Sequence, residues 1–226
     1  MSSLITFLNC DPEELHVMVD IETLSTSKDA AITEIGACIV GSQSVSLTVN
    51  PVFHSECMDP GGDIDTDTIK WREVNGLPWL TWEELHTPSI NDPEHISTVL
   101  PRFFTWLVER LELTKRSKLI MWCKGTDFDK VILETAWKYR CYASPLPAIK
   151  PQLPWQYNNF HDLRTLLKVF PQFKVSKETV MHDGLQDSIQ QASQLVKIAE
   201  HITYLDYTNK QTYSENIQLR QEGNSQ

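Results

Sequence analysis

The feature of this sequence that most constrains its fold is a short apolar run, HVMVDI, at residues 16–21. Its composition, rich in β-branched residues, predicts a buried β-strand. Side chains at positions i and i+2 lie on the same face of a strand, so Asp20 and Glu22 leave its end side by side. Two carboxylates held so close repel each other, and one takes up a proton unless a cation binds. A divalent metal that prefers oxygen ligands, Mg²⁺ or Mn²⁺, resolves the conflict, whereas the structural alternative is a solvated strand end.

The rest of the pattern predicts a mixed α/β domain with helices packed on a sheet. Alternating apolar residues around Gly41-Ser42 predict a hairpin with strands at 32–40 and 45–49, so the chain opens with three antiparallel strands. Another buried strand is expected at 119–122. Apolar residues at helical spacing predict helices at 93–111 (Asp92 as N-cap, Pro93 first, Pro101 inside), 128–140, 162–169 and 187–203.

The sequence favours one domain over two. We expect an N-terminal extension at 1–15, the domain itself at 16–205, and a frayed polar tail at 206–226 that is rich in Gln, Asn and Glu. Four prolines between residues 143 and 157 predict a long loop. A domain boundary in that loop is the alternative, but the segments on either side are too short to hold separate cores.

Charge and cysteine usage exclude several classes of protein. With 30 acidic and 20 basic residues, the net charge of −10 disfavours long-range attraction to nucleic acid, but it allows an enzyme whose acids bind cations. Five scattered cysteines without a C-x-x-C pair argue against a disulfide framework and favour a reducing compartment, with the cytoplasm as the default. No run approaches about 18 apolar residues, and no basic region precedes the first apolar stretch, so neither a membrane span nor a secretory signal is expected.

Two more segments carry acids at the boundaries of predicted elements. In WCKGTDFDKVIL, Asp129 stands where a strand turns into a helix; we expect Asp127 to cap that helix, while Asp129 is equally open to capping and function. In MHDGLQDSIQQA, Asp187 opens the long amphipathic helix, and His182 lies on the loop before it, beside Gly184. Considered singly, Asp187 is equally well explained as a cap, and a lone loop histidine is more often a surface residue.

Taken together, four acids and one histidine form a metal site that carries its own base. Mg²⁺ usually binds through carboxylates and substrate phosphate oxygens. Two such ions can activate water and stabilise the departing oxygen of an in-line displacement at phosphorus. An unperturbed histidine has a pKa of about 6.5, so His182 can take the proton of that water at neutral pH.

The motifs resemble those of the DEDD superfamily of 3′-to-5′ exonucleases, in the branch that uses a histidine base. Asp20 and Glu22 match D-x-E-T, Phe128-Asp129 matches the second motif, and His182 with Asp187 matches H-x(4)-D. The similarity is closer to a group with phage DexA-type exonucleases and a mycobacterial exoribonuclease, which suggests a phage or prophage origin. It spans residues 16–200 and is carried by VMVDIETLSTSKDAAITEIGACI, WCKGTDFDKVIL, PWQYNNFHDLRTL and HDGLQDSIQQA.

This resemblance implies an RNase H-like mixed sheet with helices on both faces, and release of nucleoside 5′-monophosphates from a 3′ end. It implies two divalent ions, Mg²⁺ or Mn²⁺, held by Asp20, Glu22, Asp129 and Asp187, with His182 as general base. Thr23 and Leu24 are implied to contact the 3′-terminal nucleotide. Many relatives have Asn where this chain has Gly125, so the contact made by that Asn is in doubt, with Lys124 as the candidate replacement.

The expected substrate is a single-stranded 3′ end, because no duplex-reading module is visible. DNA is favoured by the phage resemblance, and RNA is the alternative. Two further hypotheses are a catalytically silent binding module and a structural divalent-cation site with no nucleotide substrate. The candidate residues for stacking on bases are Trp122, Trp155, Tyr157 and Phe160, although such aromatic residues more often pack in a core or loop. The candidate residues for binding phosphates are Lys115, Arg116, Lys118, Lys168, Lys174 and Lys177, although such basic residues more often form a solvated face. Trp71, Trp79 and Trp82 either cover the core or form a dimer face, so the oligomeric state stays open.

Overall fold

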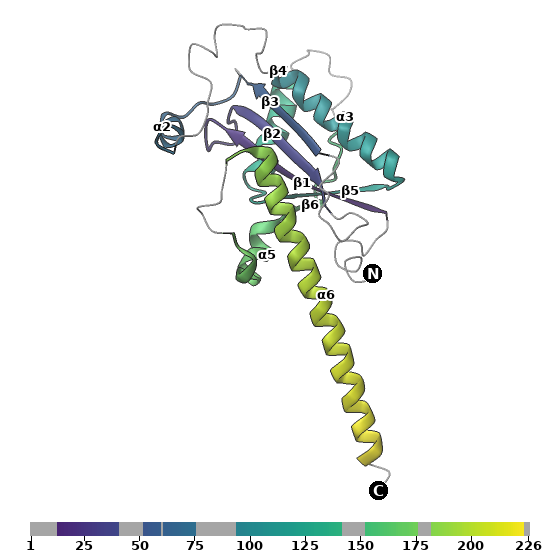
Figure 1. Ribbon diagram of the computed structural model, residues 1–226. Helices are drawn as coiled ribbons and strands as arrows, with labels where there is room; N and C mark the ends of the chain where they lie inside the picture. Colours follow the sequence, from purple (N-terminus) through teal and green to yellow (C-terminus); the bar gives the residue numbers. More distant parts are fainter. Residues whose placement is uncertain are drawn as a thin grey trace.

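The computed structural model describes residues 13–40, 52–59, 61–75, 94–141, 152–175 and 182–223. The strands in this part of the chain form one mixed sheet in the order β4-β3-β2-β1-β5-β6 (Figure 1). β1, β2 and β3 are antiparallel neighbours, whereas β5 runs parallel to β1 and β6 runs parallel to β5. The strands are β1 (Glu14–Thr23), β2 (Ile32–Ile39), β3 (Val52–Met58), β4 (Glu94–His95), β5 (Lys118–Cys123) and β6 (Phe160–Asp162).

Helices cover both faces of the sheet, and the mixed α/β class predicted from the sequence is confirmed. The alternating side chains of β1 divide the core: Leu15, Val17 and Val19 pack in one cluster with α3 and α4, whereas Met18 packs with α5 and α6. The helices are α2 (Thr66–Val74), α3 (Ile96–Thr114), α4 (Asp129–Ala136), the π-helix η1 that continues it (Trp137–Cys141), α5 (Leu163–Val169), the 3-10 turn η2 (Pro171–Phe173) and α6 (Gly184–Gly223).

The third strand lies later in the chain than the sequence predicted. The predicted strand at 45–49 and the Gly41-Ser42 turn lie outside the described residues, and the strand that pairs with β2 is β3. The short strands β4 and β6 were also missed. Segments of two and three residues are too short to show a period of two, and in β3 the described buried side chains are only Phe53 and Cys57.

The start of α3 differs from its prediction, although the helix itself is confirmed. It begins at Ile96, and its N-cap is His95, whose ring nitrogen Nδ1 accepts a hydrogen bond from the Ser97 backbone at 3.2 Å. The predicted cap, Asp92-Pro93, lies outside the described residues. Pro101 lies within the helix, which continues to Thr114.

The starts of α4 and α2 also show where capping was misjudged. Asp127 is not the cap of α4, because Phe128 occupies the N-cap position without a side-chain hydrogen bond. α2 was not predicted at all. Its N-cap is Asp65, whose carboxylate accepts hydrogen bonds from the backbone of Asp67 and Thr68.

α6 is longer than expected, and the prediction of a frayed tail after Tyr207 is wrong. Its first half packs on the sheet through Ala192, Leu195 and Ala199, while the second half extends away from the domain (Figure 1). In that second half, Lys210 pairs with Asp206 one turn earlier at 2.7 Å, the kind of contact that supports an exposed helix. In the described part of the chain, no helix is both long enough and apolar enough to span a membrane.

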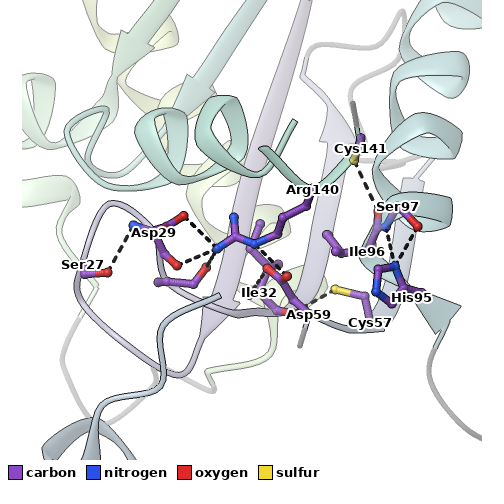
Figure 2. Close-up of polar contacts among 11 residues, drawn as sticks. Ser27, Asp29, Ile32, Cys57, Asp59, His95, Ile96, Ser97, Arg140 and Cys141 are labelled. Carbon is purple, nitrogen blue, oxygen red and sulfur yellow. Dashed lines mark hydrogen bonds and ion pairs between the residues drawn. The ribbon is translucent and has the colours of Figure 1, made fainter. Parts of the chain in front are cut away.

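A buried ion-pair network joins the end of η1 to the loops that follow β1 and β3 (Figure 2). Nη2 of Arg140 donates to the backbone oxygen of Asp29 at 2.6 Å and to its carboxylate at 3.0 Å. Nε of Arg140 lies 2.8 Å from Oδ1 of Asp59, whose side chain is fully buried. Asp59 also accepts a hydrogen bond from the Ile32 backbone at 3.2 Å. One guanidinium therefore fixes the start of β2 against the helical layer.

We predict that Arg140→Met lowers the free energy of unfolding by about 3–5 kcal/mol, because it leaves the buried Asp59 carboxylate without its cation. The measurement is urea denaturation followed by circular dichroism. Lys210→Met, which breaks an exposed pair on α6, is the control and should cost at most about 0.5–1 kcal/mol. Equal losses in the two variants would contradict the account.

Candidate metal centre

A cavity of about 670 Å³ collects all five residues that the sequence predicted to carry the chemistry. Asp20 and Glu22 reach it from β1, Asp129 from the start of α4, and His182 and Asp187 from the start of α6 and the residues before it. β5 runs parallel beside β1, and α4 follows β5, so three of the acids come from the carboxyl ends of two adjacent parallel strands. The fourth acid arrives with α6.

The first two acids are placed by the pleat of β1. They alternate with Val19 and Ile21 and so lie on the other face of the strand, the one that faces α6. The β1–β2 ladder shifts its register between Glu22 and Thr23. Such bulges re-aim side chains next to functional sites. Glu22 is buried and accepts a hydrogen bond from Nη1 of Arg72 at 2.8 Å.

α6 reaches these acids because two glycines let its first turn lie directly on β2. Gly36 pairs with Asp20 across the ladder, and a Cβ on Gly36 would come within 2.1 Å of the carbonyl carbon of Gly184. A Cβ on Gly184 would meet the backbone oxygen of Asp20 at 3.3 Å. Glu34 accepts a hydrogen bond from the backbone of Leu185 at 3.3 Å. The first turn of α6 is therefore fixed beside Asp20.

At the start of α6, one residue caps the helix and others line the cavity. Oδ1 of Asp183 accepts a hydrogen bond from the Gln186 backbone at 2.8 Å, so Asp183 caps the helix and Asp187 does not. Asp187 lies further inside the first turn and is buried. His182 has a φ of 49°, a left-handed conformation that costs about 1–3 kcal/mol and concentrates at functional sites. Ligand atoms of Glu22, His182 and Asp187 all lie within 4.8 Å of one another.

Asp129 enters from the opposite face of the sheet at the first position of α4. Its side chain is buried, and this burial raises the pKa of Asp129 to about 7, although hydrogen bonds from Cys123 and the backbone oppose the shift. Phe128, the second member of its motif, also lines the cavity. Asp129 is therefore not the N-cap of α4, and its carboxylate lies at the cavity with the other acids.

The acids raise each other's pKa values. Burial raises the pKa of Asp20 well above its ordinary value, and the charges of Asp129 and Glu22 raise it further. Burial also raises the pKa of Glu22, which the bond from Arg72 partly offsets. The four acids therefore cannot all ionise cheaply without additional positive charge. Carboxylate oxygens beside one imidazole suit a hard divalent ion, so the residues present fit Mg²⁺ or Mn²⁺.

α2, which the sequence analysis missed, contributes four residues to the cavity lining: Asp67, Thr68, Trp71 and Arg72. Arg72 is almost fully buried against Glu22, whereas Trp71 is 46% exposed and lines the cavity. The Trp71 ring lies edge-on to the His182 imidazole, with 4.8 Å between ring centroids. Asp65 before Thr66 was the available sequence signal for this helix. Trp71 therefore lies at the site rather than over the core, and the companions proposed for it, Trp79 and Trp82, lie outside the described residues.

Lys124 and Arg164 add positive charge to the cavity. Gly125 has a φ of 144°, and a Cβ there would come within 2.8 Å of Nη2 of Arg164. The same nitrogen donates to the backbone oxygen of Lys124 at 2.7 Å. Gly125, at the position for which the resemblance implied Asn, therefore leaves room for the guanidinium of Arg164. Arg164 was not selected in the sequence analysis.

The two predicted nucleotide contacts are placed differently. Thr23 lines the cavity, and its hydroxyl donates to the backbone oxygen of Ser25 at 2.8 Å. Leu24 is 3% exposed and is not among the residues that line the cavity. Its backbone instead bonds to Ala31 and Asp65. The structure therefore brings Thr23, but not Leu24, to the site.

The other candidate contacts lie away from the cavity. Trp122, Trp155 and Phe160 are buried in the core, as the structural alternative proposed, while Tyr157 is exposed. Lys118 starts β5, and Lys115 and Arg116 precede it, so this basic cluster lies at the far end of the strand whose carboxyl end forms the site. Lys168 and Lys174 are exposed and do not line the cavity. Lys177 lies outside the described residues.

Comparison with known proteins identifies a family and a fold. A family model described as the 3′-5′ exoribonuclease Rv2179c-like domain matches residues 15–203. No curated protein matches the sequence significantly. Among solved structures, S. pombe Pop2p in a form with Mg²⁺ and Mn²⁺ bound is similar at 10% identity and a TM-score of 0.51, covering 86% of this chain and 85% of that one. This likeness concerns the fold alone, and it agrees with the RNase H-like architecture implied by the motifs.

Two further solved structures match with lower TM-scores. The RNase domain of the yeast Pop2 protein is 13% identical with a TM-score of 0.49, covering 88% of this chain and 80% of that one. Exonuclease X in complex with 5′ overhanging duplex DNA is 16% identical with a TM-score of 0.43, covering 81% of this chain and 90% of that one.

We predict that Gly36→Ala weakens Mn²⁺ binding and lowers the free energy of unfolding by about 1–3 kcal/mol, because the new methyl group meets the α6 backbone and must displace it from Asp20. Isothermal titration with Mn²⁺ and urea denaturation measure the two effects. Gly61→Ala is the matched control, since its Cβ would lie 3.6 Å from the Arg140 side chain, an ordinary contact. Wild-type Mn²⁺ affinity in Gly36→Ala would show that the glycine contact does not set the site.

Proposed function

Because the chain belongs to the family of Rv2179c-like 3′-5′ exoribonuclease domains, we propose that it is a metal-dependent exonuclease that hydrolyses single-stranded nucleic acid from the 3′ end and releases nucleoside 5′-monophosphates. The observation that carries this proposal is the meeting of Asp20, Glu22, Asp129, Asp187 and His182 in one cavity. These acids come from three separate segments of the fold, and burial raises the pKa values of Asp20, Glu22 and Asp129.

The proposed roles follow from the chemistry of these side chains. Asp20, Glu22, Asp129 and Asp187 are the ligands of two divalent ions, Mg²⁺ or Mn²⁺. Such a pair of ions supplies Lewis-acid stabilisation of the charge that develops on the phosphate and the leaving oxygen. Arg72 keeps one oxygen of Glu22 engaged at 2.8 Å, which orients the other oxygen for ligation.

His182 is the proposed general base. Burial lowers the pKa of His182 below its ordinary value, although the charge of Asp187 opposes the shift, so the imidazole is neutral at pH 7 and can accept a proton. Its left-handed backbone conformation and the edge of the Trp71 ring fix where the imidazole lies. The proton that it accepts is the one lost by the attacking water.

The cavity also offers contacts that suit a strand end. Lys124 and Arg164 add cationic groups for phosphate oxygens, and Trp71 presents an exposed aromatic surface beside the acids. Base stacking on an aromatic ring together with nearby positive charge is the usual basis of single-strand binding. Thr23 completes this surface, whereas a direct role for Leu24 has no support from its placement.

RNA is the substrate that we now put first, since the matching family is described by exoribonuclease activity. This reverses the DNA preference expected from the phage resemblance, which no comparison supports. Discrimination between the two depends on contacts to the 2′-hydroxyl. A cytoplasmic location stays a prediction from the sequence, and the oligomeric state stays open.

We predict a metal-dependent ladder that shortens from the 3′ end when 5′-labelled single strands are incubated with Mg²⁺ or Mn²⁺, with RNA cut faster than matched DNA. Asp187→Asn should abolish the ladder without loss of thermal stability, because it removes one of four repelling acids. Asp206→Asn, an exposed acid on the same helix, should behave like wild type. A folded wild-type protein that shortens neither strand would instead favour the silent binding module.

We predict that His182→Ala lowers kcat by about 10²- to 10⁴-fold, the contribution expected of a positioned base. Single-turnover kinetics measure the rate, and fluorescence anisotropy with a labelled strand in Ca²⁺ measures binding. Affinity for the strand should change little. A variant that mainly loses strand affinity would refute the general-base role.

A further inference from the structure

Gln191 is a buried polar residue of α6 that directly contacts the acid cluster. It lies one helical turn after Asp187, on the same side of the helix, and lines the cavity with only 3% of its surface exposed. Its Nε2 donates a hydrogen bond to Oδ1 of Asp20 at 2.6 Å. α6 therefore supplies the site with an acid and, one turn later, with a donor to another acid.

The chemistry of this contact has a direction. An ionised carboxylate only accepts hydrogen bonds, so the amide must present its NH₂ group to Asp20. The bond occupies Oδ1 and leaves Oδ2 as the oxygen that is free to turn toward a cation. The donor also favours the charged form of Asp20, which is the form that binds metal.

We propose that Gln191 is a positioning residue that orients Asp20 and thereby sets the affinity of the site for divalent metal. This inference rests on the metal-dependent function proposed above. Partners that hold a metal ligand in this way are worth about 10- to 100-fold in metal affinity. Gln191 acts through Asp20 and is not itself a catalytic residue.

The neighbouring Gln194 offers a matched comparison. It is also 3% exposed on α6, and Oε1 of each glutamine is a buried atom without a hydrogen-bond partner among the described residues. Nε2 of Gln194, however, donates to the backbone oxygen of Phe173 at 2.8 Å and not to an acid of the site. The two glutamines therefore differ mainly in the group that their amide holds.

The test compares Gln191→Met with Gln194→Met, which replace the amide by an apolar side chain of similar length. Isothermal titration of each full-length variant with Mn²⁺ should show a dissociation constant raised by about 10- to 100-fold for Gln191→Met and unchanged for Gln194→Met. Thermal unfolding checks that both variants are folded. Gln191→Ala, which cannot overpack the cavity, repeats the measurement if Gln191→Met does not fold.

A second readout separates this inference from the proposed function. With the wild type active, Gln191→Met should need a correspondingly higher Mg²⁺ concentration for half-maximal rate, and saturating Mg²⁺ should restore most of kcat. If the wild type binds Mn²⁺ but hydrolyses no strand, the exonuclease proposal fails while the affinity comparison still decides the role of Gln191. The inference would be overturned if Gln191→Met bound Mn²⁺ as tightly as the wild type, or if both methionine variants lost the same amount of Mn²⁺ affinity. A wild type that binds no Mn²⁺ would also overturn it.

Discussion

The mutual repulsion of four carboxylates is the constraint on which the rest of this structure depends. Asp20, Glu22, Asp129 and Asp187 line one cavity; burial raises the pKa values of Asp20, Glu22 and Asp129, and neighbouring carboxylates raise those of Asp20 and Glu22 further. Arg72 and Gln191 hold two of these acids by hydrogen bonds, but they add only one positive charge between them. We propose that divalent metal relieves this local destabilisation, so that metal binding and the stability of this region are linked.

The fold contributes rigidity where the acids meet. β1 is the central strand, paired on both sides, and its end delivers two acids with fixed spacing. The contact between Gly36 and Gly184 brings α6 to the sheet without intervening side chains. The strained backbone at His182 directly precedes the cap residue Asp183, so the imidazole is held between the start of α6 and the ring of Trp71. Arg140, which does not line the cavity, joins η1 to the loops that follow β1 and β3.

The sequence predicted which side chains meet at the cavity better than it predicted the elements around them. The spacing of Asp20 and Glu22 on a strand is a local property, and the motifs around Asp129 and His182 are short and specific, so these residues could be selected without a structure. Arg72 and Trp71 could not, because α2 has weak apolar periodicity and its contact with Glu22 bridges segments distant in sequence. The cap of α6 was left open because Asp183 and Asp187 both fit a helix start, and only the backbone decides between them. Between Tyr204 and Ser214 the side chains of α6 are mostly exposed, so this part of the helix lacked the pattern by which buried helices are recognised.

The most direct test of this account is the anomalous diffraction of a crystal soaked in Mn²⁺. The account predicts two anomalous peaks, about 4 Å apart, bounded by Asp20, Glu22, Asp129 and Asp187. It also predicts that Arg72 stays bonded to one oxygen of Glu22 while the other oxygen ligates. A cavity without anomalous signal at saturating Mn²⁺, or ions bound only at other acidic residues, would contradict the assignment of these four carboxylates as a metal centre.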